Sequence, residues 1–267
     1  MDTTLIEKHF DKIGARIKFS EVVPTWRNAA GIDIREDKFG EFFDIRVDIN
    51  KQVKYEVVDL KPDMRHLLLL ARRDGNKEKF LCGHDERHWF VCAVPGKSVS
   101  GVITAMEALQ PADVQATVNA KLKRIKNCFT RKNEAFVRQG EWFFISTPEL
   151  FVEESFSNRF YRNEPISRGN GSKAHICEQV YRTNGESVMV CNRYPMGLTT
   201  KQFNQLLKQN RKTKNWNWRQ MTRNASVFAR GDVRHPDHKT IVLEGWHRVL
   251  MNTENEAPGM RHVVFLD

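Results

Sequence analysis

Alternating apolar and polar residues predict β-strands along most of this chain. In EFFDIRVDI, residues 41–49, apolar residues from Phe43 to Ile49 alternate with charged ones, as in a strand with one buried face. Residues 54–60 and 65–72 predict two further strands. The four consecutive leucines at 67–70 are bounded by charged residues, so we expect that strand to be buried on both faces.

Turn-forming residues between the apolar segments predict how the strands are connected. Glycine and asparagine adopt the backbone angles of tight turns more readily than other residues, and they separate several pairs of apolar segments. Hairpin turns are therefore predicted at residues 83–87, 139–140, 184–185 and 244–245. The last of these would join strands 240–243 and 246–250, and residues 261–266 predict a final strand.

Apolar spacing and end signals predict four helices. They cover residues 4–13, 98–109, 111–126 and 198–209. Thr199 or Thr200 is the predicted N-cap of the last helix, and Ser98 or Ser100 that of the second. Pro111 suits the first turn of the third helix, because a helix begins without needing that backbone N–H.

The order of these elements predicts an α+β fold. We expect mostly antiparallel sheet with a central helical pair and one later amphipathic helix, because strands and helices do not alternate regularly. The chain of 267 residues is long enough to bury a core as a single α+β unit, 1–267. The alternative is two lobes, a strand-rich one at 1–110 and a basic one at 111–267.

The positive charge of the chain is segregated. Residues 1–63 hold 11 Lys and Arg against 13 Asp and Glu, whereas residues 64–267 hold 32 against 20. Residues 187–231 contain nine Lys and Arg and no acidic residue. A local positive field of this kind is typical of proteins that bind a polyanion, and a solubilising surface is the alternative.

Two basic segments of the C-terminal half are candidates for nucleic-acid binding. In KQNRKTKNWNWRQMTR, residues 208–223, Trp216 and Trp218 would present both rings on one face of an extended chain, where bases could stack. Core packing of the two rings is the alternative. Residues 121–132 supply a second basic run. The candidate binding residues are Lys121, Lys123, Arg124, Lys126, Arg131, Lys132, Arg211, Lys212, Lys214, Trp216, Trp218 and Arg219.

A histidine-rich segment, RHPDHKTIVLEGWHRV at residues 234–249, is the candidate catalytic site. His235, Asp237 and His238 crowd five residues, and His247 follows further along. Histidines can transfer protons during phosphodiester cleavage, or histidine and aspartate can hold a divalent metal for the same reaction. The alternative is a polar loop in which Asp237 caps a turn. On a strand, an Arg-His neighbour pair points to opposite faces, so the useful pairs lie across a hairpin.

A second cluster of ligand-type residues surrounds the turn predicted at 83–87. The residues Cys82, His84, His88 and Cys92 have the side chains of a zinc site, but their spacing differs from that of closed structural sites. We therefore expect no zinc there and treat it as the weaker alternative. The five cysteines are an odd number in a chain too long to need disulfides, so reduced thiols are expected.

Three hypotheses of function remain. The leading one is a nucleic-acid-binding protein, for RNA or another single strand. The alternative is a nuclease that uses the His235, Asp237 and His238 cluster, with a divalent metal as its possible cofactor, and the second alternative is a non-catalytic subunit with protein partners. The chain has no apolar run of about 18 residues and no signal pattern at its start, so we expect a cytoplasmic protein without a membrane partner.

Overall fold

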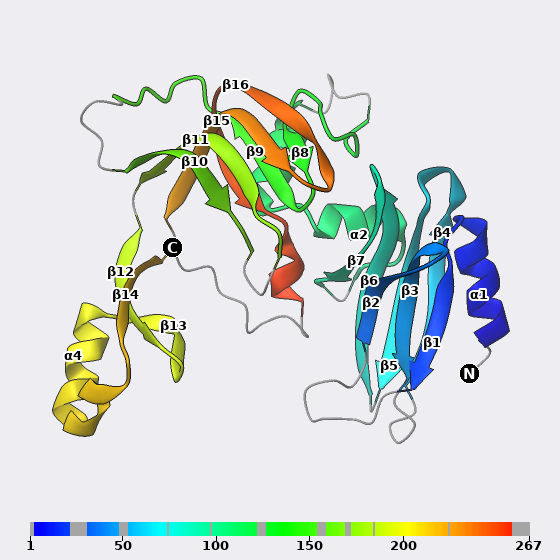
Figure 1. Ribbon diagram of the computed structural model, residues 1–267, viewed down its shortest axis with the longest axis horizontal. Coiled ribbons are helices and arrows are strands. Elements are labelled where there is room, and N and C mark those ends of the chain that lie inside the picture. Colours follow the sequence, from blue (N-terminus) through cyan, green and yellow to red (C-terminus); the bar gives the residue numbers. More distant parts are fainter. Residues whose placement is uncertain are drawn as a thin grey trace. The chain divides into compact units, whose positions relative to one another are not determined.

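The computed structural model shows a predominantly β protein (Figure 1). Strands hold 53% and helices 22% of the described residues, which form four sheets. This corrects the predicted α+β class, because the sheets rather than a central helical pair form the frame. The structure describes residues 3–21, 31–47, 53–73, 75–96, 98–121, 127–153, 159–168, 172–183, 185–223 and 225–257.

The chain divides into two compact units. Unit 1 comprises Met1–Asn119 and Asn252–Arg261, and unit 2 comprises Ala120–Met251 and His262–Asp267. Unit 1 thus contains a segment near the end of the chain. Its helical turn η3 (Thr253–Glu256) is held by Glu254, whose buried carboxylate accepts a hydrogen bond from the backbone N–H of Ala93 at 3.0 Å. No helix in the described ranges is long and apolar enough to span a membrane.

Unit 1 is built from two sheets and helices. The first sheet contains β1 (Ile17–Glu21), β3 (Gly40–Val47) and β2 (Gly31–Asp37), in that order, and the second contains β4 (Lys54–Lys61), β5 (His66–Arg73), β6 (Asn76–Asp85) and β7 (His88–Val94). Helix α1 (Thr3–Lys12) contributes Ile6 and Phe10 to a core shared with both sheets. The hairpin predicted in residues 77–96 is confirmed by the pairing of β6 with β7.

The four leucines of β5 are buried on both faces, as predicted. Leu67 and Leu69 belong to the core shared with α1, whereas Leu68 belongs to a second core with α2 (Val102–Ala108). A strand between two apolar layers needs apolar residues at successive positions, so the four leucines follow from its central place.

The N-terminus of α2 is capped by a residue far away in the sequence. The carboxylate of Asp59, in β4, accepts a hydrogen bond from the backbone N–H of Val102 at 2.8 Å. A Cβ at Gly101 would lie 2.8 Å from that carboxylate, so a side chain at this position would displace the capping group. The predicted caps Ser98 and Ser100 are therefore wrong. A neighbouring helix, α3 (Ala112–Lys121), begins just after Pro111 as predicted, and residues 122–126 lie outside the described part.

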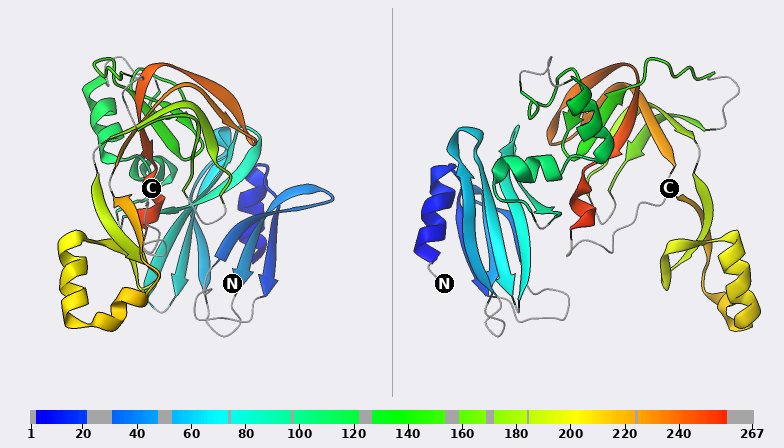
Figure 2. Two further views of the ribbon diagram at one scale, coloured as in Figure 1. Left: turned by 60° about the vertical axis from the view of Figure 1, so that its left-hand side comes forward. Right: turned by 180° about the vertical axis from the view of Figure 1, so that it is seen from behind.

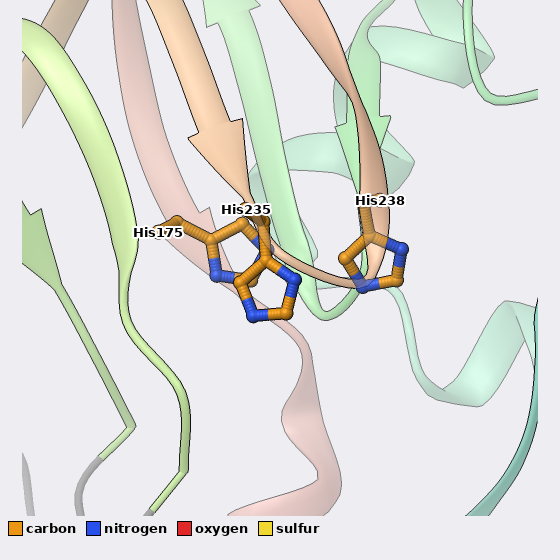
Figure 3. Close-up of side chains that lie close together, drawn as sticks. All are labelled: His175, His235 and His238. Carbon is orange, nitrogen blue, oxygen red and sulfur yellow. The ribbon is translucent and has the colours of Figure 1, made fainter.

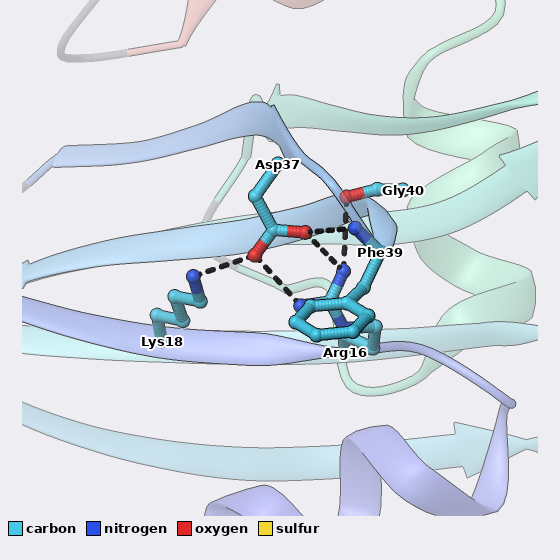
Figure 4. A network of polar contacts seen from close by, with 5 residues as sticks. All are labelled: Arg16, Lys18, Asp37, Phe39 and Gly40. Atoms are coloured by element: carbon cyan, nitrogen blue, oxygen red, sulfur yellow. Dashed lines mark hydrogen bonds and ion pairs between the residues drawn. The ribbon is translucent and has the colours of Figure 1, made fainter.

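A compact ionic network closes the β2–β3 hairpin (Figure 4). Arg16 donates to both carboxylate oxygens of Asp37 at 2.8 Å, and Lys18 donates to one of them at 2.7 Å. Arg16 also donates to the carbonyl of Gly40, and the N–H of Phe39 donates to Asp37. The hydrogen bonds from Arg16 and then Lys18 hold the pKa of Asp37 far below its usual range.

Unit 2 contains a six-stranded antiparallel sheet. Its strands are, in order, β10 (Phe160–Ile166), β11 (His175–Thr183), β15 (Ser226–His235), β16 (His238–Met251), β9 (Trp142–Ser146) and β8 (Val137–Gln139). The hairpin predicted to turn near Gln139 and Gly140 is confirmed as β8–β9. The hydrophobic core of the six-stranded sheet includes Phe144, Cys177 and Val233.

One long strand, β16, replaces the hairpin predicted at residues 240–250. The register of β15 against β16 shifts between Ala229 and Gly231, opposite the Glu244-Gly245 step, and Gly245 has φ +77°. The glycine that suggested a turn thus serves a β-bulge, which also favours a positive φ. The turn lies instead at Pro236 and Asp237, between β15 and β16.

A small three-stranded sheet extends from β11 and β15. It consists of β13 (Tyr194–Thr199), β12 (Glu186–Cys191) and β14 (Arg219–Arg223), with α4 (Thr200–Gln209) against it (Figure 2). The pairs Thr183–Ser226 and Glu186–Arg223 continue one register, so β11 does not turn back at residues 184–185. The predicted hairpin is wrong because each strand pairs with a distant one.

Helix boundaries in the remaining segments agree with the apolar spacing. Helix α4 begins after Thr199, whose hydroxyl accepts a hydrogen bond from the N–H of Gln202, and this confirms Thr199 as one of the two predicted caps. The helical turn η2 (Arg211–Asn215) follows. Helix α1 starts one residue earlier than predicted. The strand predicted at 261–266 lies outside the described residues.

Candidate functional site

Three histidines lie side by side at one end of the six-stranded sheet. His235 ends β15 and pairs with His238, which begins β16 across the two-residue turn. His175 begins β11. The next residue, Ile176, pairs with Arg234 of β15, so His175 lies next to His235 in this antiparallel ladder. Three adjacent strands therefore each contribute one histidine at the same level of the sheet.

The three imidazoles are close enough to share a ligand (Figure 3). One nitrogen of each ring lies within 4.8 Å of the corresponding nitrogens of the other two. The ring centroids of His175 and His235 are 4.1 Å apart, those of His235 and His238 are 4.7 Å apart, and the interplanar angles are 25° and 31°. Within the described ranges this is the one group of three or more ligand-type residues that meets this spacing.

The most buried member of the cluster is His175. Its exposed fraction is 1%, and neither ring nitrogen has a hydrogen-bond partner among the described residues. Burial, together with the neighbouring His235 and His238, lowers the pKa of His175 to about 3. This imidazole is therefore neutral near pH 7 and keeps a lone pair for an acceptor role or a metal.

The turn between β15 and β16 orients His235. The backbone N–H of Asp237 donates a hydrogen bond to Nδ1 of His235 at 3.1 Å. In a neutral ring that accepts at Nδ1, the proton sits on Nε2. The carboxylate of Asp237 binds the ammonium of Lys173 at 2.7 Å and 2.8 Å, so it points to that cation.

The β8–β9 turn lies against the same histidines. A Cβ at Gly140 would lie 2.9 Å from Nε2 of His238 and 3.3 Å from Nε2 of His175, so both nitrogens face the space beside this glycine. The fully buried amide of Gln139 donates to the carbonyls of Val233 and Lys239, and its own oxygen has no partner in the described residues. Gln139 thus ties β8 to the ends of the two strands that carry the histidines.

Of the four predicted catalytic residues, the structure groups only His235 and His238 in the cluster. Asp237 lies in the turn, where its backbone N–H contacts His235 and its carboxylate binds Lys173. His247 lies nine positions further along β16, at most about 30 Å away at 3.3 Å per residue. It is buried, and its Nδ1 hydrogen-bonds with the carbonyl of Gly245 at 3.0 Å.

The four residues of the weaker zinc alternative are not brought together. Cys82 belongs to the core shared with α1, whereas Cys92 packs against the core on the other side of the sheet. Nδ1 of His88 lies 2.7 Å from the carboxylate of Glu41, and His84 packs edge-on against a tryptophan ring. Successive residues of a strand face opposite ways, and Cys92 pairs with Leu81 while Cys82 pairs with Val91, so the two cysteines face opposite sides of the sheet.

The two predicted tryptophans lie between η2 and β14, and their rings are nearly parallel. The centroids of Trp216 and Trp218 are 6.3 Å apart at 21°, and Tyr194 lies 6.3 Å and 5.8 Å from them. Trp218 is the inner ring, because its Nε1–H donates to the carbonyl of Thr213 at 2.8 Å and it forms a T-shaped pair with Phe203 at 4.9 Å. All three stacked rings are half-buried.

Exposed cations lie in the same segment of the chain as this aromatic group. The guanidinium of Arg193 lies over the ring of Trp216, 4.3 Å from its centroid. We call residues 185–223 the basic module; it holds eight Lys and Arg against one acid, Glu186, which is paired with Arg223. The other seven cations are exposed and have no carboxylate partner among the described residues. They are Arg193, Lys201, Lys208, Arg211, Lys212, Lys214 and Arg219.

The second predicted basic run is only partly described. Lys121 ends α3 and donates to the carbonyl of Glu134 at 2.7 Å. Lys132 is exposed, and Arg131 is half-buried. The remaining predicted members of the run, Lys123, Arg124 and Lys126, lie outside the described residues.

Sequence reasoning missed five residues of these two sites: His175, Tyr194, Arg193, Lys201 and Lys208. His175 stands alone in the sequence, between Ala174 and Ile176, and only the strand order reveals its neighbours. Tyr194 and Arg193 carried a usable signal, since they lie within the acid-free stretch. Comparisons with protein-family models, with curated proteins and with solved structures find no match to this chain.

Proposed function

We propose that this protein binds single-stranded nucleic acid, RNA or DNA, through the basic module. The observation that carries the proposal is the set of seven exposed cations without a carboxylate partner in the described residues, in the same module as a group of nearly parallel aromatic rings. Cations attract the phosphates, and aromatic rings stack with bases of any sequence. An ordinary solubilising surface would intersperse carboxylates among the cations, and this stretch has almost none.

The two tryptophan rings have different roles, one in the fold of the module and one in binding. Trp218 is fixed from inside the module by its hydrogen bond to Thr213. Trp216 carries Arg193 on its face, and an arginine on an aromatic ring occupies a position that a base could take. We therefore assign base stacking to Trp216 and support of the module to Trp218.

The test is a fluorescence anisotropy titration of a labelled single-stranded oligonucleotide at several salt concentrations. Contacts between seven cations and phosphates would give a slope of log affinity against log salt of about −5. Replacing Arg211, Lys212 and Lys214 together by glutamine should weaken binding and reduce the size of that slope by about 2.

The matched control removes the same charge from unit 1. The exposed residues Lys8, Lys54 and Lys61 are replaced by glutamine, and we expect unchanged affinity and slope. Equal losses in both triple variants would mean that net charge alone is responsible. Absence of binding by the unaltered protein at low salt would refute the proposal.

A second candidate function is cleavage of the bound strand at the histidine cluster. The pairing of His235 with His238 across the turn, next to His175, favours it. At a pKa of about 3, His175 is a poor proton-transfer group near neutral pH, so metal-assisted hydrolysis suits the cluster better than histidine acid–base catalysis. Cleavage that needs a divalent metal and is lost in His238→Ala would support it, and the absence of cleavage with any divalent metal would refute it.

A further inference from the structure

The histidine cluster has the composition of a metal site with an open position. Three imidazoles from three adjacent strands converge within 4.8 Å, and no acidic side chain belongs to the group in the described residues. Three histidines with a fourth position left to water or substrate are the ligand set of many catalytic zinc sites. Imidazole also suits copper, iron and nickel, whereas magnesium and calcium prefer oxygen ligands.

A second, independent observation is the unsatisfied state of His175. An imidazole that is 99% buried with neither nitrogen hydrogen-bonded leaves a donor and an acceptor without compensation within the described structure. Buried polar groups are nearly always paired, so a site that leaves one unpaired calls for a ligand. A metal bound to one nitrogen would supply that partner.

We propose that His175, His235 and His238 bind one divalent transition-metal ion, of which zinc fits best. The ion would lie beside Gly140, because Nε2 of His175 and of His238 both face that space. The inference concerns metal affinity alone, so it does not depend on nucleic-acid binding by the basic module. The proposal names the ligand of the histidine cluster, a metal ion, whether or not a nucleic acid is cleaved there.

Binding requires the rings to move toward one another. Zinc–nitrogen bonds of about 2.0–2.1 Å in a tetrahedron place the ligand nitrogens about 3.4 Å apart. The present spread of up to 4.8 Å therefore shortens by an ångström or more, through rotation of the imidazoles.

The turn must also change when the metal binds. If Nε2 of His235 binds the metal, the ring proton moves to Nδ1, where it faces another donor, the N–H of Asp237. If Nδ1 binds the metal instead, the metal takes the place of that N–H. Either way the hydrogen bond from Asp237 to His235 is lost. The amide of Asp237 is thus a reporter of metal binding inside the site.

The experiment is a titration of tag-free, chelator-treated full-length protein with zinc, in competition with a coloured chelator. We expect one zinc per chain, and the same site should take cobalt(II) with the visible absorption of tetrahedral coordination. His175→Leu and His238→Gln should each weaken zinc binding by more than about 100-fold, since a direct ligand counts for more than its supporting partners. His247→Gln, a buried histidine of the same sheet outside the cluster, should leave zinc affinity unchanged.

Two results would overturn the proposal. The first is zinc binding that persists in His175→Leu and His238→Gln, and the second is absence of stoichiometric binding by the unaltered protein. Nuclear magnetic resonance of the unaltered protein keeps the test valid if a variant fails to fold. Zinc should shift the ring signals of these three histidines and the amide of Asp237, and unchanged signals there would also refute the site.

Discussion

Replacing His175 by leucine should stabilise the metal-free protein, although polar-to-apolar changes inside proteins often have the opposite effect. The side chain is 1% exposed, and both nitrogens lack partners among the described residues. Leucine is of similar size and has no polar atoms to satisfy. The variant therefore removes a cost of folding rather than an interaction.

The magnitude follows from two unsatisfied nitrogens. Each costs about 1–3 kcal/mol when buried without a partner, so the low end for both is about 2 kcal/mol. The change of shape from a flat ring to a branched chain costs up to about 1.5 kcal/mol. We expect a net gain of about 1 kcal/mol, which corresponds to a rise in Tm of roughly 2–4 °C.

Zinc should reverse this order of stability. At a free concentration 100 times its Kd, a ligand that binds only the folded protein adds about 2.7 kcal/mol to the free energy of unfolding. The unaltered protein should gain that amount and His175→Leu almost none. The unaltered protein then becomes the more stable of the two by about 1–2 kcal/mol.

The assay is urea unfolding with and without zinc, followed by hydrogen exchange of the β11 amides so that unit 2 is observed directly. His247→Leu is the matched control, because His247 is also buried but hydrogen-bonds with Gly245. It should lower the stability by about 1 kcal/mol and leave the zinc response intact. If His175→Leu lowers the metal-free stability as much as His247→Leu does, the argument from unsatisfied nitrogens is wrong.

Three further predictions test other parts of the molecule. Trp216→Ala should weaken binding of a single strand by up to about 100-fold with the basic module still folded, whereas Trp218→Ala should unfold the module in circular dichroism; the reverse would refute the assigned roles. Because the pKa of Asp37 is lowered in the folded protein, its contribution to stability is present above about pH 4 and is lost as pH falls. Asp37→Asn should therefore make acid unfolding less steep, and an unchanged dependence of stability on pH would contradict the ionic network around Asp37. Gly140→Ala should lower zinc affinity by crowding two histidine nitrogens, while Gly245→Ala, at a similar positive φ but in open space, should not; equal effects would point to backbone strain alone.

Local patterns were the reliable part of the sequence analysis. The β6–β7 and β8–β9 hairpins join neighbours in the chain, and their turns lie where glycine and charged residues predict them. The N-cap Thr199 and the two-sided burial of residues 67–70 were likewise readable, since they depend on residues within one element. The rings of Trp216 and Trp218 are nearly parallel, but the segment is not the extended one that was predicted, because Trp216 has φ −87° and ψ 33° and Asn217 has φ +49°.

Pairing between strands far apart in the chain decided the features that the sequence did not predict. The sequence by itself determined that strands dominate, that positive charge gathers in the C-terminal half, and that His235 and His238 flank a stiff proline turn. Only the tertiary structure decided that Glu244-Gly245 is a bulge within one long strand, and that β11 lies beside β15. Strand order depends on hydrogen bonds between residues far apart in the chain, and no local propensity encodes them. His175 therefore joins the other two histidines through the fold alone.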